Sequence, residues 1–202
     1  MTKANWKSYI KNHLAKIDKT NRYHAIVIEK TIDTVYSQMF SEMYARDKRG
    51  MYKYLRTYKE IIMGGQAAGL AIALSNAPVV LPRINGGVFD VYYKVGDAGS
   101  SIPCELTGKD MYDRSVASTY DTLDVQGRYL ASYAAGSLYV NKALSTTDAV
   151  YYTILPKFST LSDTNEVLLP MGADEILADR VLDTMRLIPP VDLLNNNADT
   201  NG

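Results

Sequence analysis

Residues 43–61, MYARDKRGMYKYLRTYKEI, mark the point where the spacing of the apolar residues changes. Before this stretch, apolar side chains recur every three or four residues, which is the spacing of one helix face. After Gly50, the aromatic residues Tyr52, Tyr54 and Tyr58 fall on alternate positions, which is the spacing of a β-strand. The sequence therefore predicts helices before this point and a β-rich region after it.

Two amphipathic helices are predicted before the change, over residues 3–17 and about 20–45. A short separation between them favours an antiparallel helical hairpin. The apolar stripes are Trp6, Ile10, Leu14 and Ile17 in the first helix, and Ile28, Ile32, Val35, Met39 and Met43, widened by Tyr36, Phe40 and Tyr44, in the second.

Short apolar runs after residue 50 predict a sheet. A first strand over 51–61 is followed by glycines that turn the chain, so that residues 70–74 return as its partner strand. An extended edge is expected at 78–82, and the further strands are expected at 87–95, 127–134, 137–141 and 150–155.

Two more helices are predicted in the second half of the chain. A short one begins near Thr107, which would cap it, and ends near residue 116. The last one covers 173–188, with Asp174 and Glu175 at its start and Pro189-Pro190 at its end. Its apolar stripe comprises Ile176, Leu177, Val181, Leu182 and Met185.

These elements define the α+β class: an N-terminal helical hairpin, a central, mainly antiparallel β domain and a C-terminal helix. The expected parts are the hairpin at 1–50, the β-rich body at 51–160, a closing helix within 161–190 that packs on the helical part, and a polar tail at 191–202. Together they are expected to form one integrated domain.

The charges are unevenly distributed along the chain, although the formal net charge is zero. Residues 1–60 contain thirteen Lys or Arg and six Asp or Glu, a balance of +7, and residues 61–202 contain nine and sixteen, a balance of −7. Such a dipolar chain can order subunits against unlike neighbours or hold a basic end near nucleic acid, and it is equally compatible with a first helix that is solubilised by lysines.

Tyrosine is the unusual component of the composition, with sixteen Tyr against three Phe and one Trp. A tyrosine combines an apolar ring with a hydroxyl that can stay hydrated, which suits subunit contacts. The candidate interface residues are Trp6, Tyr9, Tyr23, Tyr36, Tyr44, Tyr52, Tyr54 and Tyr58.

The sequence contains few features that indicate a cellular compartment or a membrane span. The single Cys104 excludes an intramolecular disulfide and fits a chain made in a reducing cytosol, where it would be a small buried side chain. No apolar signal-peptide region opens the chain. Residues 61–82 carry no charge, but their glycines, Gln66 and Asn76 argue against a membrane span.

The sequence offers little for catalysis, and we expect no enzyme, no catalytic residue, no cofactor and no metal. Both histidines, His13 and His24, fall in predicted helices, so a catalytic triad is not expected. The spacing of Gly64 and Gly69 resembles a phosphate loop, but Leu70 stands where that loop needs lysine.

Acidic residues resemble two further kinds of site in part, a calcium-binding loop and a hydrolytic site. The end of the chain, 197–202, imitates the opening of a calcium-binding loop but lacks the closing glutamate. A hydrolytic site built from acidic residues such as Asp110 and Asp121 is the least supported hypothesis. The carboxylates Asp110, Asp113, Asp121 and Asp124 are more simply a hydrated acidic surface.

The order of the elements resembles that of the head-to-tail adaptor, or connector ring, proteins of short-tailed bacteriophages, crAss-like phages included. The resemblance covers most of the chain. It is carried by the helical N-terminus, the Tyr-rich strand at 52–58, the step from Val80-Leu81-Pro82 to Gly87-Val88, the hairpin at 127–141, the segment 152–159, and Glu166-Val-Leu-Leu-Pro170-Met-Gly172 before the last helix.

This resemblance implies a structural virion protein without chemistry, made in the host cytoplasm and located at the junction of capsid and tail. It implies a homo-oligomeric ring, commonly of twelve subunits, beneath the portal protein. The other partners would be further tail or ring proteins, with DNA only as passing cargo and no membrane. The alternative is a single-stranded nucleic-acid-binding protein that uses the basic N-terminal half with Tyr52, Tyr54 and Tyr58.

Overall fold

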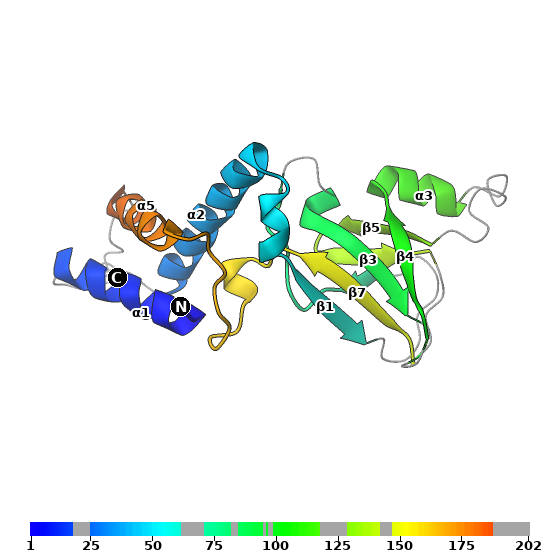
Figure 1. Cartoon of the computed structure of the whole chain (residues 1–202), viewed down its shortest axis with the longest axis horizontal. Helices are drawn as coiled ribbons and strands as arrows, with labels where there is room; N and C mark the ends of the chain where they lie inside the picture. Colours follow the sequence, from blue (N-terminus) through cyan, green and yellow to red (C-terminus); the bar gives the residue numbers. More distant parts are fainter. Residues whose placement is uncertain are drawn as a thin grey trace, which may run out of the picture. The chain divides into compact units, whose positions relative to one another are not determined.

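The computed structural model describes residues 1–17, 25–61, 71–81, 85–94, 96, 99–117, 129–141 and 147–187. The chain divides into two compact units, one formed by Met1–Glu42 with Leu161–Gly202 and the other by Met43–Thr160. Helices dominate the first unit and a sheet dominates the second (Figure 1). The α+β class predicted from the sequence is thus confirmed, with helices at both ends of the chain and a mainly antiparallel sheet between them.

The helical unit contains α1 (Lys3–Ile17), most of α2 (Ala25–Arg46) and α5 (Ala173–Leu187). The predicted stripes are largely confirmed, because one face of each helix is buried. Ile176 is the exception in α5, with 51% of its surface exposed. Met43 is partly exposed, and the side chain of Ile17 lies outside the described residues. The buried stripe residues are Trp6, Ile10 and Leu14 in α1, Ile28, Ile32, Val35, Tyr36, Met39, Phe40 and Tyr44 in α2, and Leu177, Val181, Leu182 and Met185 in α5.

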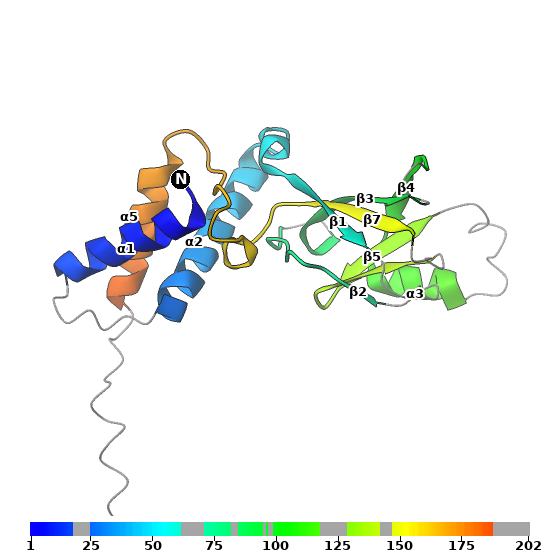
Figure 2. The ribbon, with the colours of Figure 1, turned by 90° about the horizontal axis from the view of Figure 1, so that it is seen from below.

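The predicted hairpin helices are both present, and they cross near their first turns. Lys3 in the first turn of α1 forms an ion pair with Glu29 in the second turn of α2. Figure 2 shows α1 and α2 meeting at an angle rather than running side by side. The predicted start of the second helix, at 20–24, lies outside the described residues.

The start of α1 is held by the segment that precedes α5. The carbonyl oxygens of Asn165 and Asp163 accept the backbone N–H groups of Lys3 and Ala4 at 3.0 and 3.1 Å, and the Thr2 hydroxyl accepts that of Asn5. These bonds satisfy N–H groups that a helix start leaves without an internal partner. The N-terminal helix and the segment before the C-terminal helix are therefore fixed to each other.

The second unit is built on a seven-stranded sheet with the order β1-β7-β3-β4-β5-β6-β2. The pairings are antiparallel except that of β4 with β5, which is parallel. The strands are β1 (Arg56–Ile61), β2 (Ala71–Ala73), β3 (Val88–Lys94), β4 (Ser101–Leu106), β5 (Leu130–Ala134), β6 (Ser137–Val140) and β7 (Ala149–Ile154).

The structure corrects two predictions about the sheet and adds one strand. Tyr52 and Tyr54 lie in a 3₁₀ turn, η1 (Gly50–Tyr54), because Met51 and Tyr54, three residues apart, are the buried pair. The strand β2 pairs with β6 and not with β1. The strand β4, which contains Pro103 and does not alternate clearly, was not predicted.

Two glycines fix the path of the chain between strands. Gly87 has a φ of +96°, and a Cβ atom there would lie 2.1 Å from the carbonyl oxygen of Val79, so only glycine fits. Ala135 and Gly136, with φ of 50° and 82°, form the two-residue turn between β5 and β6. Positive φ at both central residues is the conformation of a type I′ hairpin.

The short helix α3 (Lys109–Ala117) confirms the predicted helix but not its cap. The carbonyl oxygen of Gly108 accepts the N–H of Tyr112 at 2.9 Å, so Gly108 is the N-cap residue of a helix that begins at Lys109. The Thr107 hydroxyl is buried without a hydrogen-bond partner and does not cap the helix. Cys104 is buried as predicted, and burial raises the pKa of its thiol to about 11.

The described helices include none that is both long and apolar enough to cross a bilayer. Residues 62–70 of the charge-free segment lie outside the described residues.

Candidate functional site

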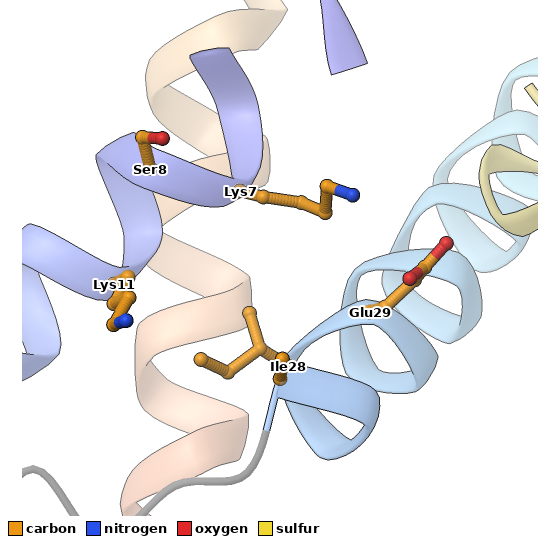
Figure 3. A pocket seen from close by; sticks show the side chains of 6 residues that line it. Lys7, Ser8, Lys11, Ile28 and Glu29 are labelled. Atoms are coloured by element: carbon orange, nitrogen blue, oxygen red, sulfur yellow. The ribbon is translucent and has the colours of Figure 1, made fainter. Parts of the chain in front are cut away.

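A groove between α1 and α2 is the candidate binding surface of the helical unit. Its cavity has a volume of about 170 Å³. Figure 3 shows Lys7 extending from α1 toward α2, while Ile28 faces α1 from the first turn of α2. The lining residues are Lys7, Ser8, Lys11, Ala25, Ile28 and Glu29. The groove therefore combines an apolar floor with two lysines.

A buried lysine connects the two sides of the groove. Lys3 is 5% exposed, and its ammonium group donates to the carbonyl oxygen of Leu161 at 2.9 Å and pairs with Glu29 at 2.5 Å. A buried ammonium group needs such partners because burial removes its hydration. Glu29 is thus engaged by Lys3. The other charged residues that line the groove are Lys7, which pairs with Asp163, and Lys11.

Lys7 is more exposed and pairs with Asp163 at 2.6 Å. This hydrogen bond from Lys7 is the main cause of a lowered pKa for the Asp163 carboxyl group. Both partners face solvent, so the pair positions the segment before α5 but adds little stability.

The exposed charges of the helical unit are segregated by helix. The helix α1 has four lysines and no acidic residue, whereas α5 has four acidic residues and two arginines. Both arginines are engaged, because Arg180 pairs with Glu42 and Arg186 pairs with Asp183. Within the described residues, no ion pair involves Lys11 and Lys16 of α1 or Asp174, Glu175 and Asp179 of α5.

The candidate interface aromatics divide into buried and exposed residues. Tyr9 and Tyr52 are exposed, by 37% and 60%. Tyr58 is half-buried and stacks on Tyr152 with 5.7 Å between ring centroids. Tyr23 lies outside the described residues. The remaining candidates, Trp6, Tyr36, Tyr44 and Tyr54, are buried within their own chain and pack its core.

The three tyrosines of the nucleic-acid hypothesis do not share one exposed surface. Tyr54 is 7% exposed, with the Lys53 ammonium group 5.0 Å from its ring centroid. Tyr58 stacks within the sheet unit, which leaves Tyr52 as the exposed ring. A stacking platform needs several accessible rings along one groove.

In the sheet unit, Glu60 joins the two edge regions of the sheet. Its Oε1 atom accepts hydrogen bonds from the backbone N–H and hydroxyl of Ser75, at 2.7 and 2.5 Å, and from the Tyr152 hydroxyl at 2.9 Å. Glu60 lies on edge strand β1, and Ser75 follows edge strand β2. These contacts bring the edges together and account for the curl of the sheet.

The described residues that could take part in catalysis are dispersed. The rings of His13 and Tyr9 are tilted by 38°, with 4.2 Å between their centroids, and His13 Nδ1 donates to the backbone carbonyl of Tyr9, within α1. His24, Asp121 and Asp124 lie outside the described residues, and Asp110 and Asp113 are exposed on α3. In the parts of the chain that the structure describes, no three His, Cys, Asp or Glu side chains are grouped as metal ligands.

The phenol groups of three buried tyrosines are expected to lose their protons at a higher pH than exposed tyrosines do. Burial is the main cause that raises the pKa of Tyr93, Tyr112 and Tyr152 to about 12, from an ordinary value of 10.0. The neutral phenols therefore stabilise the fold fully below pH 10, and this contribution is lost as the pH rises from 10 to about 12. The phenolate absorbance of the native protein should rise in two phases, and that of the urea-unfolded protein in one. A single native phase near the ordinary pKa would contradict the burial of these rings.

No protein-family model matches the chain, and no curated protein matches it significantly.

Sequence reasoning did not find the groove. The spacing of Lys7 and Lys11, four residues apart, places both on one face of α1. The groove itself depends on the angle at which α2 crosses α1, which the helix periodicity does not specify.

Proposed function

We propose that this chain is a structural subunit of the homo-oligomeric ring that joins a bacteriophage capsid to its tail. The observation that carries the proposal is the return of α5 to the N-terminal helices, with a sheet unit inserted between them. This is the order of elements on which the resemblance to connector ring proteins depends. The ring, of about twelve subunits according to that resemblance, would surround the passing DNA in the virion.

The segregated charges of the helical unit support assembly with unlike surfaces. A basic α1 and an acidic α5 on one unit offer two different faces to neighbours. Complementary charges favour the correct partner and suppress contacts between like faces. Copies of the chain, the portal protein and further tail or ring proteins are the proposed partners.

The test is assembly in the presence of the portal protein of the same virus. The purified chain, the portal and their mixture would each be examined by mass photometry and negative-stain microscopy. We expect rings of the chain on the portal, with the portal alone as the control. A chain that stays monomeric and does not bind the portal would contradict the proposal. A salt-sensitive affinity for single strands under the same conditions would favour the nucleic-acid alternative instead.

A further inference from the structure

We propose that the α1–α2 groove of one copy binds the exposed face of α5 of the next copy, in a head-to-tail contact. This inference rests on the proposed ring function and names the surfaces that join its subunits. It starts from Ile176, an isoleucine that is 51% exposed although α5 buries a full apolar stripe on its other side.

The residues that share the exposed face of α5 with Ile176 lie three, four and seven positions further along the helix. They are Asp179, Arg180 and Asp183. Arg180 pairs with Glu42 and Asp183 pairs with Arg186, and no ion pair of Asp179 is found within the described residues. The exposed face of α5 therefore combines an apolar side chain with two carboxylates and an arginine that is engaged by Glu42.

The α1–α2 groove has the complementary chemistry. Ala25 and Ile28 are its apolar lining residues, and Lys7 and Lys11 are its basic ones. Figure 3 shows Ile28 facing α1, on which both lysines lie. An apolar side chain that enters an apolar recess, with opposite charges at its edge, is the usual arrangement of a specific protein contact. Within the part of the chain that the structure describes, no ion pair involves Lys11.

The two surfaces are distinct, because none of the residues that line the groove belongs to α5. The buried stripe of α5, with Leu177, Val181 and Met185, faces the core, so Ile176 and its acidic neighbours face outward. Figure 3 shows the ribbon of α5 running behind the groove. One copy therefore carries both halves of the contact.

This geometry selects a second copy as the occupant. A contact between two unlike faces of the same chain is heterologous, and it repeats from copy to copy until the rotation closes a ring. A contact between two identical faces would bring lysines against lysines or carboxylates against carboxylates, which is unfavourable.

Engineered cysteines test the contact directly. Ser8→Cys is placed in the groove and Ile176→Cys on α5, while the native Cys104 is buried and has a raised pKa. With the portal present, a mixture of the two variants should form a disulfide-linked dimer under mild oxidation, and neither variant should do so alone. The double variant should give a ladder of linked species on a non-reducing gel.

The matched control is Gln38→Cys, which is exposed on α2 about 20 Å along the helix from Ala25. It should not form a disulfide with Ile176→Cys. The contact is wrong if Gln38→Cys links as well as Ser8→Cys, or if either single variant of the pair links to itself. It is also wrong if rings seen by mass photometry show no link between Ser8→Cys and Ile176→Cys.

Charge reversal separates this inference from the proposed function. Lys11→Glu and Asp179→Lys should each weaken self-association by at least about tenfold, and combining them should restore much of the loss. If both single variants assemble like the natural chain, the contact is wrong while the ring function stands. If the natural chain itself stays monomeric with the portal, the proposed function fails and this contact with it.

Discussion

Trp6→Ala should lower the free energy of unfolding by about 3–5 kcal/mol, the range for truncating a large buried aromatic residue. Trp6 is 1% exposed and is among the largest fully buried side chains. Its removal leaves a cavity at the helix that is attached to the segment before α5, so the helical unit should suffer most. Urea unfolding followed by circular dichroism measures the change.

Tyr9→Ala is the matched control for this prediction. Tyr9 lies one turn along α1 from Trp6 and contacts its ring edge to face at 6.1 Å, but it is 37% exposed. Its loss should cost about 1 kcal/mol or less. Trp6→Phe should cost less than Trp6→Ala, because it keeps an aromatic ring and removes a buried indole N–H that has no partner. Equal losses for Trp6→Ala and Tyr9→Ala would show that the burial of Trp6 is not important.

Lys3→Met should lower the free energy of unfolding by about 2–3 kcal/mol. Removing one member of a fully buried ion pair costs about 3–5 kcal/mol. The expected loss is smaller here because the Glu29 side chain is 28% exposed and keeps some hydration after Lys3 is replaced. The carbonyl oxygen of Leu161 also loses its ammonium donor. The fluorescence of Trp6, the single tryptophan of the chain, reports unfolding of the unit that contains Lys3.

Lys7→Met provides the comparison, since Lys7 lies one turn further along α1 and also pairs with a carboxylate. Because that pair is exposed and screened by water, its loss should leave stability nearly unchanged. The double variant Lys3→Met with Glu29→Gln should recover part of the loss, since it removes the uncompensated charge. The burial argument is refuted if Lys3→Met and Lys7→Met have the same effect.

Periodicity predicted the helices well because burial of one helix face repeats along the chain. The stripes of α1, α2 and α5 could be predicted from local spacing alone, and most of their residues are buried. Ile176 was assigned to the stripe because its spacing permits it, although Leu177, Val181 and Met185 already fill the buried face. The spacing of apolar residues shows which positions of a helix lie on the same side. It does not show how many of these positions the rest of the protein covers.

Strand pairing could not be predicted in the same way. The short apolar runs located β3, β5, β6 and β7, but β2 was assigned to the wrong neighbour and β4 was not found. Partners in a sheet can be far apart in the sequence, as β1 and β7 are, so no local pattern names them. The 3₁₀ turn at Gly50–Tyr54 placed two tyrosines at alternate positions without forming a strand.

The candidate surfaces show the same limit. The residue type alone does not specify whether a tyrosine is buried. The aromatic content therefore did not reveal that Tyr36 and Tyr54 pack the core while Tyr9 and Tyr52 face solvent. The charge segregation between the two ends of the chain was visible in the sequence. That a basic α1 and an acidic α5 share one unit was not visible.

The sequence by itself determined the class of the fold and the helices with most of their buried faces, because each depends on residues close together in the chain. The tertiary structure alone decided the strand order, the curl closed by Glu60 and Ser75, and the groove between α1 and α2. The physical reason is that packing angles and long-range pairings are set by the whole set of side chains that meet, and not by the spacing within one segment.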